Sequence, residues 1–273
     1  MMRLVMSNDQ KAVRHGGALK LRRSASFGEV SFEPLMSLRV QNQTPKDRAT
    51  PPYITTYILG DAANSASKPS RRGGARNRAD RESHALTVSQ IANLIAATPH
   101  AERIGLPFTR MVTIHWHAAG VSLDSMAKAT GRFLDLLSKT LARHESETAW
   151  IWVHENGRNK GGHCHLLAHV PPALVSTVTR LQKRWLRRIV GKPYRSRVIR
   201  SRPIGGRLGV ECGNPALHAA NLEASLRYVL KGADAEAAAL FTLDNVEPGG
   251  RIIGKRCGTS QNIGPKARKA CRK

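Results

Sequence analysis

The sequence TAWIWVHENGRNKGGHCHLLAHV, residues 148–170, decides the fold. Its first part, residues 148–155, is rich in aromatic and β-branched side chains, which favours a β-strand. Its last part, residues 163–170, has the length of a second strand. Residues 156–162 between them are polar and contain glycine, which is typical of a turn. The stretch therefore predicts a β-hairpin.

The histidines of this hairpin share one face of its second strand. Because side chains alternate along a strand, His163 and His165 point to one side, whereas Cys164 and Leu166 point to the other. The apolar side is the natural core face, so we expect the histidines on the opposite face. If the hairpin pairs Glu155 with His163, the carboxylate joins the two imidazoles there.

Two imidazoles and one carboxylate make a reasonable set of ligands for a divalent metal ion. The alternative is that the two histidines are solvated or hydrogen-bonded without a metal, which is the commoner state of such a pair. A second pair, His115 and His117, lies at the end of an expected strand and makes a poorer cage, although His115 could lie near the site. We therefore predict Glu155, His163 and His165 as the metal ligands.

The elements around the hairpin indicate an α+β fold. Strands are expected at residues 109–116 and 195–204, and amphipathic helices at 124–144, 173–190 and 215–233. The order β-α-β-β-α-β-α contains the split βαβ plan, which is ferredoxin-like or RRM-like. In that plan the first and third strands are central in an antiparallel sheet, and helices cover one face. The other face stays open for a site.

The last expected helix carries a candidate nucleophile. Tyr228 and Lys231 are three residues apart, so they share a helix face. A tyrosine beside a metal-bound phosphate can act as a nucleophile once it loses its proton, and a nearby ammonium group would hold the phosphate or the phenolate. The alternative is a half-buried Tyr228 with a solvated hydroxyl, and Tyr194 is the main competitor. We predict Tyr228 and Lys231 as the catalytic pair.

The charge of the chain indicates a polyanionic partner. The 273 residues carry a formal net charge of +25, and residues 156–210 contain thirteen Lys or Arg without one acid. Such a one-sided surface attracts phosphates. Aromatic residues make up only 5% of the chain, so extended base stacking is not expected to dominate. We expect binding through the phosphate backbone of the nucleic acid, with a few contacts to base edges. The predicted nucleic-acid-binding residues are Arg180, Lys183, Arg184, Arg187, Arg188, Arg195, Arg197, Arg200 and Arg202.

Composition divides the chain into three parts. Residues 1–85 show no settled apolar period and are expected to be a flexible basic N-terminal region. Residues 86–234 hold the periodic elements and form the folded domain, and residues 235–273 are expected to be a basic C-terminal tail. Neither a secretion signal nor an apolar run of about 18 residues is recognised. We therefore expect no membrane partner and a cytoplasmic location.

Three ordered motifs resemble a known superfamily. Glu155 followed by His163-Cys164-His165 on strands, and then Tyr228-x-x-Lys231 on a helix, resembles the HUH endonucleases, in particular the single-tyrosine rolling-circle replication initiators. The sequence HENG at 154–157 resembles the same region in initiators of small circular single-stranded DNA replicons. The resemblance covers about residues 108–234, and it implies that residues 86–234 form an HUH-type nuclease domain.

The resemblance implies a metal-dependent, site-specific nicking and joining of single-stranded DNA. Glu155, His163 and His165 would bind Mg²⁺ or Mn²⁺, which polarises the scissile phosphodiester. Tyr228 would attack and form a 5′-phosphotyrosine with a free 3′-hydroxyl, and Lys231 would position the phosphate. Because the bond energy stays in the phosphotyrosine, rejoining needs no ATP.

The implied biology is the initiation of rolling-circle replication of a plasmid or phage. The implied partners are single-stranded or origin DNA, with a host helicase and polymerase, because the chain has no P-loop pattern. A single-tyrosine relaxase or transposase would share this chemistry. A non-enzymatic RRM-like nucleic-acid-binding protein is the alternative from another class, although the aromatic pair that such modules use for stacking is missing.

Overall fold

The computed structural model describes residues 80–206 and 213–271. The expected flexible N-terminal region, residues 1–85, therefore lies outside the described residues except at its end. There β1 (Glu82–Ser83) pairs antiparallel with β6 (Ile252–Ile253). This pairing places Glu82 and Ser83, from the region expected to be flexible, within the fold.

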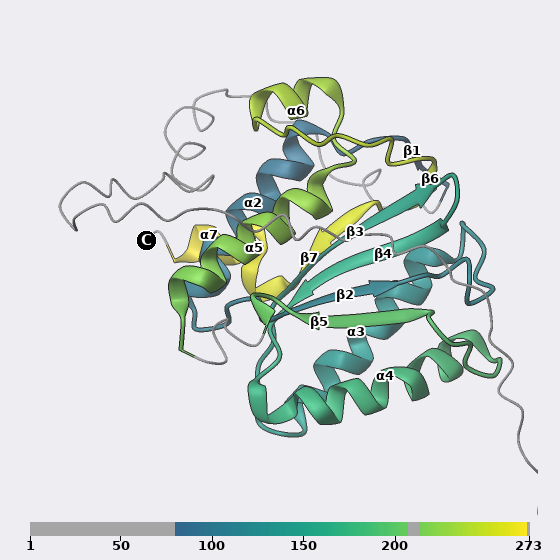
Figure 1. Ribbon diagram of the computed structural model, residues 1–273. Helices are drawn as coiled ribbons and strands as arrows, with labels where there is room; N and C mark the ends of the chain where they lie inside the picture. Colours follow the sequence, from purple (N-terminus) through teal and green to yellow (C-terminus); the bar gives the residue numbers. More distant parts are fainter. Residues whose placement is uncertain (1–79, 207–212, 272–273) are drawn as a thin grey trace, which may run out of the picture. The chain divides into compact units, whose positions relative to one another are not determined.

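The centre of the fold is a five-stranded antiparallel sheet (Figure 1). Its strands, from one edge to the other, are β5 (Ile199–Pro203), β2 (Arg110–Ile114), β4 (Gly161–Ala168), β3 (Trp150–Gly157) and β7 (Cys257–Thr259). The first four are the strands expected from the sequence. The first and third of these in chain order, β2 and β4, lie inside the sheet as expected. The α+β class is confirmed.

One face of the sheet is covered by the two helices that were expected there. These are α3 (Met126–Ala142) and α4 (Val175–Val190), which begins directly after a 3-10 turn, η2 (Pro172–Leu174). Phe133 of α3 packs edge-on against Trp185 of α4, with ring centroids 5.4 Å apart. Both rings are buried beside Cys164 and Leu166 of β4, so the apolar side of this strand is the core face, as predicted.

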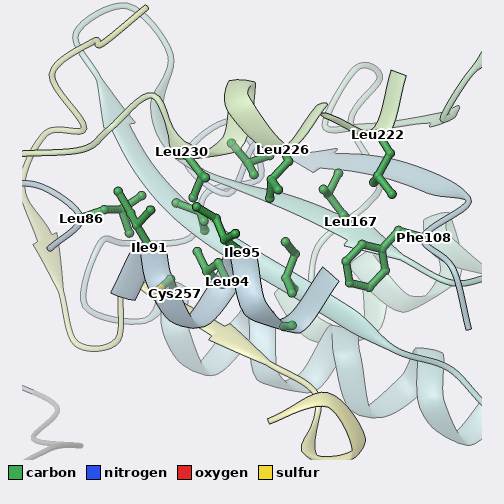
Figure 2. Packing of buried hydrophobic residues seen from close by; sticks show 14 of the residues in the cluster. Leu86, Ile91, Leu94, Ile95, Phe108, Leu167, Leu222, Leu226, Leu230 and Cys257 are labelled. Carbon is green, nitrogen blue, oxygen red and sulfur yellow. The ribbon is translucent and has the colours of Figure 1, made fainter. Parts of the chain in front are cut away.

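The other face is covered as well, which corrects the expectation of helices on one face only. Helices α2 (Val88–Arg103) and α5 (Pro215–Leu230) pack on it (Figure 2). The physical reason is a second apolar surface, in which Leu167 of β4 lies among side chains of both helices. Burial of this surface removes apolar area from water at about 25 cal/mol per Å². Its largest helical members are Ile91, Leu94, Ile95, Leu222, Leu226 and Leu230.

The segment after α5 is folded, which corrects the expectation of a basic tail at residues 235–273. It forms α6 (Ala235–Leu240), β6, β7, a 3-10 turn η5 (Gln261–Ile263) and α7 (Pro265–Ala270). β7 adds to the sheet by pairing with β3. Ile252 and Ile263 are fully buried, so a few apolar residues anchor this cationic segment in the core. In the described part of the chain, no helix is long and apolar enough to cross a membrane.

Candidate functional site

The hairpin has the register on which the metal-site prediction depends. Glu155 on β3 pairs with His163 on β4, and the turn between the strands is short. Because directly paired residues share a face, the carboxylate and the two imidazoles converge. The Nε2 atoms of His163 and His165 lie 3.3 Å and 3.6 Å from Oε2 of Glu155. All three residues are at most 4% exposed, so this cluster is buried beneath the surface.

Hydrogen bonds fix both rings with Nε2 facing the carboxylate. Nδ1 of His163 lies 2.8 Å from the carbonyl oxygen of Gly161. A carbonyl can only accept, so Nδ1 donates to it, and Nε2 of His163 faces the carboxylate of Glu155. Nδ1 of His165 similarly contacts the hydroxyl of Thr113 at 3.0 Å. Burial lowers the pKa of His165.

The cluster fits a divalent metal ion. Oε1 of Glu155 and Nε2 of His165 are buried without a hydrogen-bond partner, which is costly unless another group satisfies them. One ligand atom from each of the three residues lies within 4.8 Å of the others. A cation among these atoms would satisfy the two unpartnered atoms, so the group could hold a metal ion.

A lysine completes the charge balance of the cluster. Lys231 follows the last residue of α5, and its Nζ lies 3.3 Å from Oε2 of Glu155 and 2.6 Å from Oε2 of Glu247. Burial raises the pKa of Glu155, but the imidazoles and the charge of Lys231 outweigh it and hold this pKa below its ordinary value. Burial lowers the pKa of Lys231, but Glu247 and Glu155 outweigh it and raise this pKa. Both groups are therefore charged at neutral pH.

Tyr228 lies beside this cluster on α5. Its ring is 5.0 Å from the ring of His165 in an edge-on arrangement, and Nζ of Lys231 is 4.8 Å from its centroid. The residue is 41% exposed, and it lines an open pocket of about 440 Å³ together with Lys231, Asp244 and Glu247. The predicted nucleophile and the predicted metal ligands are therefore neighbours, and solvent reaches the tyrosine.

The competing tyrosine lies elsewhere. Tyr194 packs against the core on the α3 and α4 face, with Nζ of Lys183 5.7 Å from its ring centroid. That face is opposite to the one that carries His163 and His165. Tyr53 and Tyr57 lie outside the described residues. Among the described tyrosines, only Tyr228 contacts the candidate metal cluster.

The second histidine pair contributes one residue to the surroundings of the site. His115 is half-buried, and its ring centroid is 5.6 Å from that of His163, so it lies near the site as expected. His117 is exposed and packs over Gly161, which has a φ of +62°. A Cβ atom at Gly161 would approach the His117 ring to 2.5 Å. The turn that orients His163 therefore needs glycine at this position.

Sequence reasoning missed two residues that support the site. Glu247 pairs with Lys231 through both its carboxylate and its backbone N–H, which donates to the carbonyl of Lys231 at 2.8 Å. Arg256 is 2% exposed, and all of its five N–H groups point to oxygens of Ser83, His154, Gly249 and Gly250.

Arg256 thereby joins the loop that carries Glu247 to strand β3. Its guanidinium bonds the carbonyls of Gly249 and of His154, and Asn156 N–H donates to the carbonyl of Gly249 at 2.9 Å. Burial lowers the pKa of Arg256 to about 10. Nothing in the local sequence distinguishes this arginine from its exposed neighbours. The Gly249-Gly250 pair, where added Cβ atoms would meet Arg256 and Asn156, is a weak signal for the contact.

The predicted nucleic-acid-binding residues fall on two different surfaces. On β5, Arg200 pairs with Thr113 and Arg202 pairs with Met111, so these arginines lie on the face of the metal cluster. Arg195 and Arg197 are exposed in the loop before β5. The other five are exposed on α4, which covers the opposite face of the sheet: Arg180, Lys183, Arg184, Arg187 and Arg188.

The comparisons with known proteins give no match. No protein-family model, no curated protein and no solved structure matches this chain. The function is therefore argued from the geometry of the site.

Proposed function

We propose that this protein nicks and rejoins single-stranded DNA through a 5′-phosphotyrosine at Tyr228, with a divalent metal ion. The observation that carries the proposal is the meeting of two groups from distant parts of the chain. The ring of Tyr228 on α5 lies 5.0 Å from that of His165, in a buried cluster with unsatisfied metal-ligand atoms. This is the combination of side chains that phosphodiester transfer to a tyrosine needs.

The topology is compatible with the resemblance to HUH endonucleases. The elements β2, α3, β3, β4, α4 and β5 follow the β-α-β-β-α-β order, and the sheet order β5-β2-β4-β3 places the first and third of these strands centrally. We take this as the split βαβ plan, extended by β7 and by the helices α2 and α5 on the second face. The extension supplies Tyr228, Lys231 and Glu247.

The reaction transfers a phosphodiester bond without loss of a phosphate. The hydroxyl oxygen of Tyr228 attacks phosphorus and loses its proton. The bond from phosphorus to the 3′ oxygen breaks, and that oxygen gains a proton to become the free 3′-hydroxyl. Lys231 holds a non-bridging oxygen or the developing phenolate. Glu155, His163 and His165 would hold Mg²⁺ or Mn²⁺, which supplies positive charge to the phosphate. The free 3′-hydroxyl reverses the same step when strands are joined.

The DNA strand reaches the site from the surface that carries Arg200 and Arg202. These arginines lie on the same sheet face as the cluster, and the exposed Tyr228 faces the open pocket. A biological role in rolling-circle initiation, with host helicase and polymerase, is the version we favour, and a relaxase or transposase would use the same groups. A simple RRM-like binder fits less well, because α2 and α5 pack on the face that such a module uses for RNA.

Nicking is tested directly with DNA. The full chain is incubated with a 5′-labelled and a 3′-labelled mixed-sequence single-stranded oligonucleotide pool and Mn²⁺, and the products are separated on denaturing gels. We expect shortened DNA with the 5′ label and a protein–DNA adduct with the 3′ label, both absent with excess chelator. DNA that is bound but never cut under these conditions contradicts the proposal.

Glu247 is expected to support catalysis by holding Lys231. A glutamine at this position keeps a neutral acceptor but removes the negative charge that strengthens the bond to Lys231, a loss of about 1.5 kcal/mol. Glu247→Gln should therefore lower the nicking rate about tenfold with little change in DNA affinity. The matched control is Asp244→Asn, which removes a nearby acid that pairs with Arg227 instead. Single-turnover rates and DNA binding curves are measured for both. Equal rates for Glu247→Gln and Asp244→Asn would refute a role for Glu247.

A further inference from the structure

The surface between α3 and α4 has a cationic hollow that the proposed reaction does not use. A pocket of about 380 Å³ is lined by Lys139 and Arg143 from the α3 side and by Arg184 and Arg188 from α4. An adjoining hollow adds Arg132 next to Arg188. We call these five residues the α3–α4 basic groove.

Four of the five cations of the groove have no ion pair with any residue that the structure describes. In the described part of the chain, its one ion pair joins Lys139 to Asp135 at 2.9 Å. No ion pair with a described residue involves Arg132, Arg143, Arg184 or Arg188. Like charges held together repel one another, and a bound polyanion relieves that repulsion while releasing its counterions.

The fold holds these cations in place. On α3 the basic positions 132, 139 and 143 follow helical spacing along one side, and 184 and 188 are one turn apart on α4. The buried contact between Phe133 and Trp185 fixes the two helices against each other. The α3 row spans about 16 Å, because eleven residues rise about 1.5 Å each. This is the length of about five base pairs of DNA at about 3.4 Å each.

The groove cannot serve the strand that lies in the metal site. α3 and α4 pack on the Cys164 and Leu166 side of β4, whereas the metal cluster and Tyr228 lie on the other side with α5. The sheet therefore separates the two surfaces. We propose that the α3–α4 basic groove is a second nucleic-acid-binding surface, which takes the phosphate backbone of duplex DNA independently of the metal cluster.

Duplex DNA fits this surface better than other polyanions. Trp185 is the aromatic residue that lines the pocket between α3 and α4, and it is only 5% exposed. The unstacked bases of a single strand therefore find no aromatic ring to stack on there. A membrane surface would favour apolar side chains that insert between lipids. The exposed large apolar residues in the described chain are Tyr228, Leu240 and Val246, none of which lines the groove.

The test uses the full chain, a fluorescent mixed-sequence 25-base-pair duplex and excess chelator, so that binding is measured without metal. The variant Arg184→Gln/Arg188→Gln is compared with Lys266→Gln/Lys269→Gln, which removes the same charge from exposed positions on α7. We expect the groove variant to bind the duplex about tenfold more weakly at ~0.1 M salt. The slope of log K against log salt should fall by about 2, since each phosphate contact contributes about 0.9. The α7 variant should bind like the wild type.

Two further measurements separate this inference from the proposed reaction. Nicking of a short single-stranded oligonucleotide should be unchanged in the groove variant, and thermal unfolding should show that both variants are folded. Unchanged duplex affinity in the groove variant would overturn the inference, even if nicking is observed. So would an equal loss in the α7 variant, or binding of phosphatidylserine vesicles in preference to the duplex. If the wild-type chain binds the duplex as expected but does not nick single-stranded DNA, the result contradicts the proposed reaction and leaves the inference about the groove supported.

Discussion

Replacing Tyr228 with phenylalanine is expected to abolish the covalent DNA adduct and to lower the nicking rate by at least about 10³-fold, as loss of a nucleophile does in other covalent enzymes. The substitution removes only the hydroxyl. The ring is partly exposed and would keep its edge-on contact with His165. We therefore expect the free energy of unfolding to change little, and the metal affinity to stay as in the wild type. Denaturing gels with labelled single-stranded DNA measure the adduct.

The matched control for this prediction is Tyr194→Phe. Tyr194 packs with the α3 and α4 core on the other face of the sheet, so its hydroxyl has no part in the reaction and the variant should form the adduct at the normal rate. An adduct that persists in Tyr228→Phe and disappears in Tyr194→Phe would make Tyr194 the nucleophile. Because Tyr194 lies on the face of the sheet opposite to the metal cluster, this result would contradict the proposed role of the cluster in nicking.

Replacing Glu155 with glutamine is expected to weaken Mn²⁺ binding by at least about 100-fold. Loss of an outer hydrogen-bond partner of a metal ligand already costs about 10- to 100-fold, and Glu155 is the one anionic ligand of the cluster. In the wild type, Mn²⁺ at 100 times its dissociation constant should raise the free energy of unfolding by about 2.7 kcal/mol. Titration calorimetry and thermal unfolding with and without Mn²⁺ provide readouts that do not depend on DNA.

The control for metal binding is His117→Gln, from the competing histidine pair. His117 is exposed and outside the Glu155, His163 and His165 group, so this variant should bind Mn²⁺ like the wild type. If the His117 variant loses the metal and Glu155→Gln keeps it, the ion is held elsewhere. If the wild type shows no binding at millimolar Mn²⁺, the buried cluster is not a metal site.

The hairpin was predictable because its signals are local. A one-residue shift of β4 would move every side chain to the other face, which would take Cys164 and Leu166 out of the core beneath α3 and α4 and put the polar His163 and His165 there. The same alternation places His163 and His165 on the face of the hairpin that carries Glu155. The apolar spacing after the fourth strand predicts that Tyr228 lies on a helix. The distance of Tyr228 from His165 depends on how that helix packs on the sheet, which no local pattern specifies.

The parts that sequence reasoning missed depend on contacts between distant residues. Helix α2 contains Pro99, a local signal against a helix, and the burial of Ile91 and Leu94 against the sheet outweighs it. The segment with Arg256 was interpreted from its charge, but this guanidinium is buried and bonded to backbone carbonyls. Glu247 meets Lys231 sixteen residues away, and no short motif joins them.

Charge composition indicates a polyanionic partner but does not specify the surface that would bind it. The thirteen cations of residues 156–210 lie in one acid-free stretch of sequence, yet this stretch passes from α4 on one face of the sheet to β5 at its edge. The register of β5 then turns Arg200 and Arg202 toward the metal-cluster face, while Arg184 and Arg188 remain in the α3–α4 basic groove. Only the fold separates the surface proposed for the reacting strand from the surface proposed for a second DNA segment.

The most direct test of the central claim is to identify the amino acid to which DNA becomes attached. The wild-type chain is incubated with single-stranded DNA and Mn²⁺, digested with nuclease and protease, and its peptides are sequenced by mass spectrometry. We predict a nucleotide joined through its 5′ phosphate to the peptide that contains Tyr228. Attachment at Tyr194 or at another residue, or cut DNA whose 5′ phosphate is never linked to protein, would contradict it.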